Sequence, residues 1–410
     1  MHNDRIFYSA CDCITRFNAS SFPLKNIAQE IIKSKKLNSK ERKLFLDVIF
    51  LWSRNRFLAK KFLSKNFNFF SSLSEQEKEK LILTLIVGAQ LNWTTKLESS
   101  LIEAYNKWLD DLGTERFLIA MGPLLAEEVQ KSFSLSWQNI VQSLWEKPKK
   151  YIAFDNSVDK EKLVKELKEK DVEVRPWLFF DSALEISGDL KINELSKELR
   201  EHVWFMDAGS QLIAHLIRPM AHERVLDMCV GEGGKARIIS QYPCEYYAVD
   251  INDRRLAKAK KILPRTVKFF SEDASKLSLE KNSFDWVLLD APCSGSGVMR
   301  RNPDLVHRFA RQELDNYLKL QKKLLNSAVE MLKVNGVVLY VTCSLLAREN
   351  QQQIDEIMAK TKNLIPVSLN DLIADGEIKV EALDFDKNTL SLLPNIHDCD
   401  AFFVAALRKI

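Results

Sequence analysis

Phe284-Asp285-Trp286-Val287-Leu288-Leu289-Asp290-Ala291-Pro292-Cys293 is an apolar run that ends in a polar turn, and Val337-Val338-Leu339-Tyr340-Val341-Thr342-Cys343 repeats this pattern later in the chain. Residues 311–333, between the two runs, carry apolar side chains at helical spacing, which predicts a strand, a helix and a second strand. Right-handed crossovers place such strands in parallel, often as neighbours. We therefore expect Cys293 and Cys343 to share one carboxyl edge of a sheet, where open α/β sheets bind ligands.

Strand and helix signals alternate throughout the C-terminal half of the chain. The strand candidates, separated mostly by helical patterns, are residues 224–228, 246–250, 267–270, 284–289, 337–341 and 402–407. This alternation predicts a doubly wound α/β domain over residues 204–410.

The N-terminal part of the chain has a different pattern. Residues 1–132 contain almost no glycine and repeat amphipathic helical stretches, with Asn38 or Ser39 placed to cap one helix and Ser74 to cap the next. Residues 133–203 have short β-like runs around a charged helix at 160–169. We expect an all-α domain over 1–132, followed by a small α+β subdomain over 133–203.

The composition narrows the class of protein. No apolar run reaches the roughly 20 residues needed to span a bilayer, and the first residues lack the apolar core of a signal peptide, so a cytoplasmic protein without a membrane span is expected. Seven cysteines, odd in number and scattered, do not make a disulfide framework. Cys11 and Cys13 have no matching Cys or His pair, so no metal site is expected.

Basic residues cluster within the helical part, although the net charge of the whole chain is only +4. Such a charge permits nucleic-acid binding without requiring it, so any basic surface must be local. A phosphate-binding surface and a solvated helix face are equally good interpretations of these residues: Lys33, Lys35, Lys36, Lys40, Arg42, Lys43, Arg54, Arg56, Lys60 and Lys61.

A glycine-rich turn follows the first strand of the α/β domain. It reads Cys229-Val230-Gly231-Glu232-Gly233-Gly234-Lys235 and leads into a helix, whose N-terminus offers free N–H groups to a negative group such as a carboxylate. Asp250 lies 19 residues beyond Gly231 at the end of the next strand, where an acid can accept hydrogen bonds from ribose hydroxyls. Asp273 ends the third strand. The pattern favours a nucleoside ligand over NAD, whose full G-x-G-x-x-G turn is missing.

Two thiols at one sheet edge match the chemistry of methylation at carbon 5 of a cytosine. A thiolate that adds at carbon 6 makes carbon 5 nucleophilic toward a sulfonium methyl donor, and a base must then remove the carbon 5 proton. The ring edge is inaccessible inside a duplex, so the target must be single-stranded or flipped out. The alternative is that Cys229, Cys293 and Cys343 are ordinary small buried residues, an interpretation that we prefer only for Cys229.

The segments 229–235, 290–304 and 342–355 resemble those of RNA (cytosine-5) methyltransferases of the NOL1/NOP2/Sun type. The resemblance implies a Rossmann-like class I methyltransferase domain with S-adenosylmethionine as donor. It also implies that Cys343 is the nucleophile and that Cys293 assists product release. The expected cofactor contacts are Cys229, Val230, Gly231, Glu232, Gly233, Gly234 and Lys235, with Asp250 for the ribose, Asp273 for the adenine and Asp290 near the methyl donor and the target base.

The rest of the chain extends the resemblance. The helical N-terminus is similar to the NusB-type RNA-binding domain of bacterial small-subunit rRNA methyltransferases of the B type, and the insert at 133–203 is expected to be RRM-like. These likenesses imply small-subunit rRNA as the binding partner, and a monomer is expected. After the first cysteine motif, Arg300, Arg301, Arg308 and Arg311 fit either phosphate contacts or surface roles, and His307 is expected at the surface.

Other functions stay open at this point. A tRNA-directed enzyme of the same type is one alternative, whereas a DNA cytosine methyltransferase fits less well because such enzymes need no second cysteine. A non-catalytic rRNA-binding assembly factor is another. Its motivation is that Val230-Gly231-Glu232 replaces the usual Ala-Ala-Pro of the family's cofactor loop, which places a negative charge where the methionine carboxylate is expected.

Overall fold

A computed structural model describes residues 2–93, 95, 97–133, 136–373, 378, 383 and 388–410. Contacts between residues divide the chain into two compact units. We call residues 1–146 and 299–311 the helical unit, and residues 147–298 and 312–410 the sheet unit. The three-domain division expected from the sequence stays a prediction.

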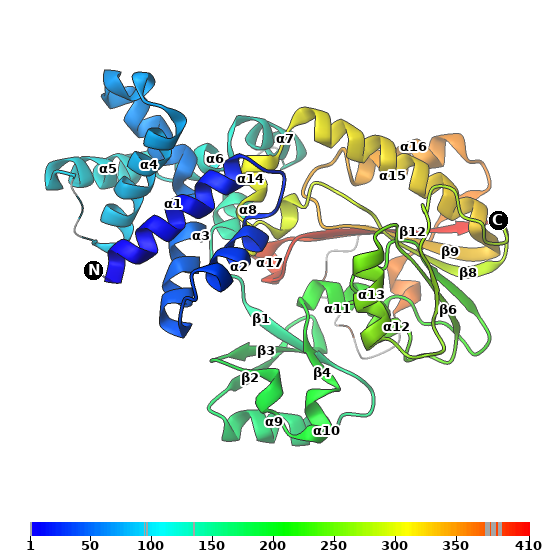
Figure 1. Ribbon diagram of the computed structural model, residues 1–410. Coiled ribbons are helices and arrows are strands. Elements are labelled where there is room, and N and C mark those ends of the chain that lie inside the picture. Colours follow the sequence, from blue (N-terminus) through cyan, green and yellow to red (C-terminus); the bar gives the residue numbers. More distant parts are fainter. Residues whose placement is uncertain are drawn as a thin grey trace. The chain divides into compact units, whose positions relative to one another are not determined.

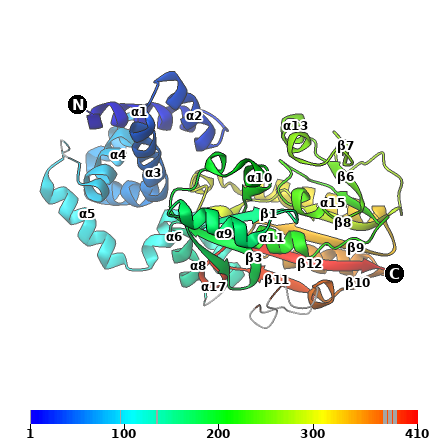
Figure 2. The same cartoon turned by 90° about the horizontal axis from the view of Figure 1, so that it is seen from below.

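The helical unit consists of helices and their connections (Figure 2), and the helices from α1 to α6 contribute side chains to one apolar core. Its helices are α1 (His2–Asn18), α2 (Leu24–Ser34), α3 (Ser39–Asn66), α4 (Glu75–Leu91), α5 (Ser99–Leu112), α6 (Glu115–Met121), α7 (Pro123–Phe133), α8 (Trp137–Leu144) and α14 (Leu305–Arg308), with a 3-10 turn at Asn68–Ser72. Asn38 caps α3 and Ser74 caps α4, each within a capping box, as predicted.

The first part of the sheet unit is a four-stranded antiparallel sheet in the order β2-β3-β1-β4. Its strands are β1 (Lys150–Phe154), β2 (Glu173–Trp177), β3 (Phe180–Ser187) and β4 (Val203–Phe205). The helices α9 (Lys160–Glu169) and α10 (Lys197–Arg200) lie beside this sheet (Figure 1). Leu163, Leu167 and Leu199 of these helices belong to one apolar core with residues of its strands. A 3-10 turn at Ile192–Glu194 precedes α10.

The second part is an eight-stranded sheet in the order β10-β12-β9-β8-β5-β6-β7, with β11 also paired to β12. The strands from β9 to β7 are parallel, and β12 is antiparallel to β9, β10 and β11. Their bounds are β5 (Arg224–Asp227), β6 (Glu245–Val249), β7 (Lys268–Phe270), β8 (Phe284–Asp290), β9 (Leu332–Thr342), β10 (Leu364–Pro366), β11 (Thr389–Leu392) and β12 (Phe402–Lys409).

Helices cover both faces of this sheet, because side chains along each strand alternate between two cores (Figure 1). Leu339 and Val341 enter the core under α11 (Ala208–His215), α12 (Ala236–Ile239) and α13 (Asp253–Ile262). Val338 and Tyr340 enter the core under α15 (Arg311–Met331) and α16 (Gln351–Lys360). The predicted doubly wound, Rossmann-like α/β fold is confirmed, as are its six strands.

Short elements complete the sheet unit: 3-10 turns at Ser296–Val298 and Leu369–Leu372, and α17 (Pro394–His397). Among the residues that the structure describes, no helix combines the length and apolarity that a membrane crossing requires.

Candidate functional site

The crossover from β8 through α15 to β9 brings the two predicted cysteines together. Strands β8 and β9 are parallel neighbours with Asp290 opposite Val341, so the loops that follow them leave the same edge of the sheet. The Sγ atoms of Cys293 and Cys343 lie 3.3 Å apart. The hydrogen bond with Cys343, together with burial, raises the pKa of the Cys293 thiol well above its usual value. Cys293 therefore keeps its proton at neutral pH.

Both cysteines line a cavity of about 510 Å³ at the carboxyl edge of the sheet. Asp250, Asp273, Asp290 and the predicted cofactor loop line the same cavity, except for Gly233. Gly233 has φ +90°, and a Cβ there would lie 3.3 Å from Ala259 of α13, so this glycine serves close helix packing instead. The structure thus gathers eleven of the twelve predicted site residues around one space.

The cofactor loop presents open backbone to the cavity. Gly231 has φ +59°, and its N–H donates to Asp250 Oδ2 at 2.9 Å. A Cβ at Gly234 would meet no atom within 4 Å. The hydrogen bond from Gly231 therefore holds the loop, whereas the space beside Gly234 is open. This space leaves room for a ligand beside the backbone.

The two acids predicted to contact a nucleoside have different surroundings. Asp250 is buried and braces the loop through the hydrogen bond from Gly231 N to its Oδ2. Its Oδ1 accepts from Asn252 N at 2.7 Å and pairs with Arg255 at 3.1 Å. Ribose contacts would use the second lone pairs of its oxygens. Asp273 accepts from Ser275 N, and this hydrogen bond lowers the pKa of the Asp273 carboxyl. It is ionised at neutral pH.

Glu232, the unusual acid of the loop, forms an ion pair with Lys258 of α13 at 2.5 Å. Its side chain is largely exposed. This partner balances the extra negative charge, so the departure from the family pattern does not leave an isolated carboxylate beside the cavity.

Lys235, the last residue of the cofactor loop, forms an ion pair with Asp290. Its Nζ donates to Asp290 Oδ2 at 2.6 Å and lies 5.4 Å from the ring centroid of Phe402. Burial alone would lower the pKa of the Lys235 amine, but the charge of Asp290 and the hydrogen bond to it outweigh burial and raise that pKa. A lysine–carboxylate ion pair therefore stands at the cavity beside the two sulfurs.

Asp227, at the end of β5, is a further acid lining the cavity that the sequence argument did not single out as a site residue. Its Oδ2 accepts from Tyr246 Oη at 2.9 Å, and its Oδ1 accepts from Cys229 N at 3.3 Å. Burial raises the pKa of the Asp227 carboxyl to about 7. Asp227 stands two residues before the cofactor loop in the sequence, but its burial was not visible there.

Two further residues that sequence reasoning missed hold the cysteine loops. A Cβ at Gly297 would lie 2.6 Å from Ala401 O and 2.9 Å from Cys343 O, so only glycine fits there. Its N–H donates to Cys343 O at 3.0 Å. Glu349, fully buried before α16, contacts both loops. The quoted motifs contained both residues, but nothing in their spacing revealed these contacts.

The basic segment after the first cysteine motif belongs to the helical unit. Arg300 is buried, and its carbonyl accepts from Arg54 Nη2 at 3.0 Å. Arg308 pairs with Asp304 at 3.0 Å and Arg311 with Glu127 at 3.3 Å, whereas Arg301 is exposed. Arg300, Arg308 and Arg311 therefore make contacts within the helical unit itself.

His307 is not a surface residue, contrary to the expectation from the sequence. Its Nε2 lies 2.7 Å from Ser53 O, and its ring packs against those of Phe17, Trp52 and Phe57. Burial lowers the pKa of His307 to about 3. The sequence did not reveal these contacts, because the residues that His307 contacts lie more than 200 positions away in the chain.

Parts of the chain are similar to known proteins. Residues 214–408 match the family model described as 16S rRNA methyltransferase RsmB/F. The ribosomal RNA small subunit methyltransferase B of Photorhabdus laumondii subsp. laumondii is 27% identical over 295 residues, which cover 70% of this chain and 65% of that protein. The match thus spans slightly less than two thirds of the relative's length.

Solved structures share the fold. The crystal structure of PH0851 is 20% identical and superimposes with a TM-score of 0.75 over 98% of each chain. The crystal structure of NSun6 from Pyrococcus horikoshii with SFG is 18% identical, with a TM-score of 0.56 over 69% of this chain and 97% of that one. At these identities the likeness concerns the arrangement of elements.

Proposed function

We propose that this chain, whose residues 214–408 form a methyltransferase domain of the RsmB/F type, transfers a methyl group from S-adenosylmethionine to carbon 5 of a cytosine in small-subunit ribosomal RNA. The observation that carries the proposal is the 3.3 Å separation of the Cys293 and Cys343 sulfurs at a cavity shared with the cofactor loop. The relative's name supports the choice of rRNA as substrate. We further propose that the protein acts as a cytoplasmic monomer.

The residues around the cavity fit S-adenosylmethionine. The open backbone at Gly234 leaves space for its methionine part, while Asp250 and Asp273 lie where a nucleoside would meet carboxylates. SFG, found with NSun6 in the related structure, is an analogue of this donor. When bound, S-adenosylmethionine supplies an electrophilic methyl group.

Cys343 begins the reaction in this proposal. Its thiolate adds to carbon 6 of a flipped-out cytosine, forming a C–S bond and moving electron density onto the ring. Lys235, held in place by its ion pair with Asp290, lines the same cavity, where its fixed positive charge stabilises the negative charge that develops on the ring. Carbon 5 then becomes nucleophilic and accepts the methyl group.

Cys293 acts in the second half of the reaction. After methylation, a base takes the proton from carbon 5, the electrons of that C–H bond re-form the C5=C6 double bond, and the bond between carbon 6 and Cys343 Sγ breaks with Cys343 leaving as the thiolate. The raised pKa of Cys293 keeps this thiol protonated in the resting site, which suits a group that assists late rather than one that attacks first. Its sulfur lies close enough to Cys343 to reach the same base.

Bisulfite sequencing of rRNA from cells lacking the gene tests the proposal. We expect one 5-methylcytosine of small-subunit rRNA to be lost and to return when the gene is restored. Loss of a site in tRNA instead would establish the tRNA-directed alternative. If no cytosine changes in either RNA although the purified protein binds RNA, the non-catalytic assembly factor is the better account.

A further inference from the structure

Glu349 is a buried carboxylate that connects the two cysteine loops. Its Oε1 accepts hydrogen bonds from Ser294 N at 2.8 Å and from Gln321 Nε2 at 3.0 Å. Its Oε2 accepts from Ser294 Oγ and Ser344 Oγ, each at 2.5 Å. Ser294 directly follows Cys293, and Ser344 directly follows Cys343. One carboxylate therefore holds the residue after each reactive sulfur.

All four of these donors are neutral groups. Burying a carboxylate costs folding free energy unless hydrogen bonds or a cation compensate its charge. The burial of Glu349 therefore depends on these four hydrogen bonds. Replacing Glu349 by an apolar side chain leaves the donors without their acceptor. The loops would then have to rearrange to satisfy them.

Other contacts join the same two loops and leave them little freedom to move separately. Ser296 Oγ lies 3.1 Å from Ser344 Oγ and accepts from Leu345 N at 2.9 Å. Gln321 also donates to Pro292 O at 2.9 Å, so α15 participates in the bracing. Glu349 lies at the centre of this set, because it contacts Ser294, Ser344 and Gln321.

We propose that Glu349 is a positioning residue that sets the distance between the Cys293 and Cys343 sulfurs, so that both can act in turn on one base. The inference deepens the proposed function and rests on it. A displacement of about 1 Å in a reacting group can lower the rate about 10²-fold. Glu349 itself does not line the cavity, so its effect passes through the two loops.

Two variants of different severity test the role. Glu349→Ala removes the acceptor, and we expect kcat to fall about 10²-fold while the KM for the methyl donor stays unchanged. Glu349→Gln keeps the side-chain length and one carbonyl oxygen, so it should rescue a substantial part of that loss. Glu356→Gln, an exposed glutamate on α16 that pairs with Lys322 and Lys360, is the matched control and should keep full activity.

The sulfur separation is measured independently of methylation with phenylarsine oxide, whose arsenic forms two As–S bonds with a close pair of thiols and releases water. We expect tight binding to the parent and to Glu356→Gln, binding at least tenfold weaker for Glu349→Ala, and intermediate binding for Glu349→Gln. Cys343→Ala gives the background from the remaining cysteines. Affinity for S-adenosylhomocysteine should be equal in all the Glu349 variants.

The two proposals fail in different ways. If Glu349→Ala and Glu349→Gln bind the arsenical as tightly as the parent does, Glu349 does not position the sulfurs, whatever the methylation assay gives. If the arsenical distinguishes the variants while the parent methylates no RNA, the proposed function is wrong and the positioning role holds. Should Glu349→Ala not fold, Glu349→Gln and Ser344→Ala provide the same comparison with milder changes.

Discussion

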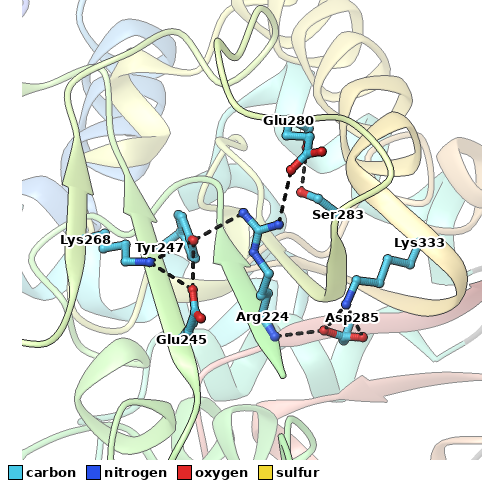
Figure 3. A network of polar contacts seen from close by, with 8 residues as sticks. All are labelled: Arg224, Glu245, Tyr247, Lys268, Glu280, Ser283, Asp285 and Lys333. Carbon is cyan, nitrogen blue, oxygen red and sulfur yellow. Dashed lines mark hydrogen bonds and ion pairs between the residues drawn. The ribbon is translucent and has the colours of Figure 1, made fainter. Parts of the chain in front are cut away.

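The two ends of the parallel strands in the sheet unit carry polar residues with opposite arrangements. At the carboxyl ends, Asp250, Asp290, Cys293 and Cys343 line a cavity. At the amino ends, polar residues at the first or second position of each strand pair with one another (Figure 3): Arg224, Glu245, Lys268, Asp285 and Lys333. The same five strands thus begin in mutual pairs and end at an open site.

The amino-end network is largely satisfied internally. Lys333 Nζ donates to Asp285 at 2.9 and 3.0 Å, and Arg224 N donates to Asp285 Oδ2 at 2.8 Å. Lys268 Nζ donates to Glu245 Oε2 and to Tyr247 Oη, each at 2.9 Å. Most of these side chains are partly exposed, so solvent screening leaves each ion pair only a small contribution to stability. This end aligns the strands. A second cavity, of about 490 Å³, lies beside it and is lined by Asp285, but by none of the predicted site residues.

The two ends of the strands differ in how they shift the pKa values of their ionisable groups. At the carboxyl ends, burial raises the pKa of the Asp227 carboxyl to about 7, and the hydrogen bond with Cys343 together with burial raises the pKa of the Cys293 thiol, so the surroundings favour the uncharged forms. Groups at the amino ends have favourable partners, and the hydrogen bonds from Lys268 and Tyr247 lower the pKa of Glu245. Substitutions at the two ends should therefore separate activity from stability.

The largest effect is expected from the cysteines. Cys343→Ala should abolish methylation and form no covalent RNA adduct, because no thiolate can add to carbon 6. Cys293→Ala should also turn over poorly but accumulate the adduct, because release is blocked after addition. Denaturing gels with labelled RNA distinguish the two variants. An adduct in Cys343→Ala and none in Cys293→Ala would reverse the role assignment.

The Lys235–Asp290 pair should give the next largest effect. Lys235→Met keeps the apolar stem and removes the charge beside the reacting ring, so we expect kcat to fall about 10²- to 10³-fold. Lys268→Met at the amino ends removes one positive charge of the same type and should leave kcat unchanged. Steady-state methylation kinetics measure both. Equal losses in the two variants would mean that the difference between the strand ends is not functional.

The pH dependence of stability should have opposite signs at the two ends. The pKa of Asp227 is raised in the folded chain, from an ordinary 3.8 to about 7, so the folded state binds the proton more tightly and its stability falls as pH rises through this window. Asp227→Asn should therefore gain stability relative to the parent between pH 5 and pH 8. Urea unfolding at these two pH values measures the gain.

Glu245 is the counterpart at the amino ends. Its lowered pKa contributes stability that is present above its unfolded pKa and is lost as pH falls through the folded pKa. Glu245→Gln should therefore differ from the parent at pH 8 and approach it in acid. If both variants change with pH in the same direction, the assignment of opposite electrostatic surroundings is wrong.

The smallest effect is expected from Asp285→Asn. The amide oxygen can still accept from Arg224 N, while the charge that pairs with Lys333 is lost. We expect a loss of no more than about 1 kcal/mol in the free energy of unfolding and unchanged kcat. Chemical denaturation and a methylation assay on the same preparation check both. A strong loss of activity would show that the amino ends influence the site.

Sequence reasoning predicted the juxtaposition of Cys293 and Cys343 because backbone rules govern it. A right-handed β–α–β crossover makes β8 and β9 parallel neighbours, and two cysteines at their carboxyl ends must then be close. The capping residues Asn38 and Ser74 were predictable for a similar reason, since caps depend on local sequence.

Side-chain contacts between distant segments were not predictable in this way. No sequence spacing predicts the hydrogen bonds of Glu349 to the two cysteine loops or the ion pair of Lys235 with Asp290. His307 was wrongly expected at the surface, because its partners Ser53 and Trp52 come from a helix near the other end of the chain. The short strands β10 and β11 lacked the length and alternation by which strands are recognised.

The central claim is that Cys343 bonds to the base, and peptide mapping by mass spectrometry tests it most directly. Cys293→Ala is incubated with S-adenosylmethionine and small-subunit rRNA, and the trapped adduct is digested with protease and nuclease. The account predicts a methylated cytosine attached to the peptide that contains Cys343. A nucleotide attached to any other residue, or no adduct with an RNA that the parent methylates, would contradict it.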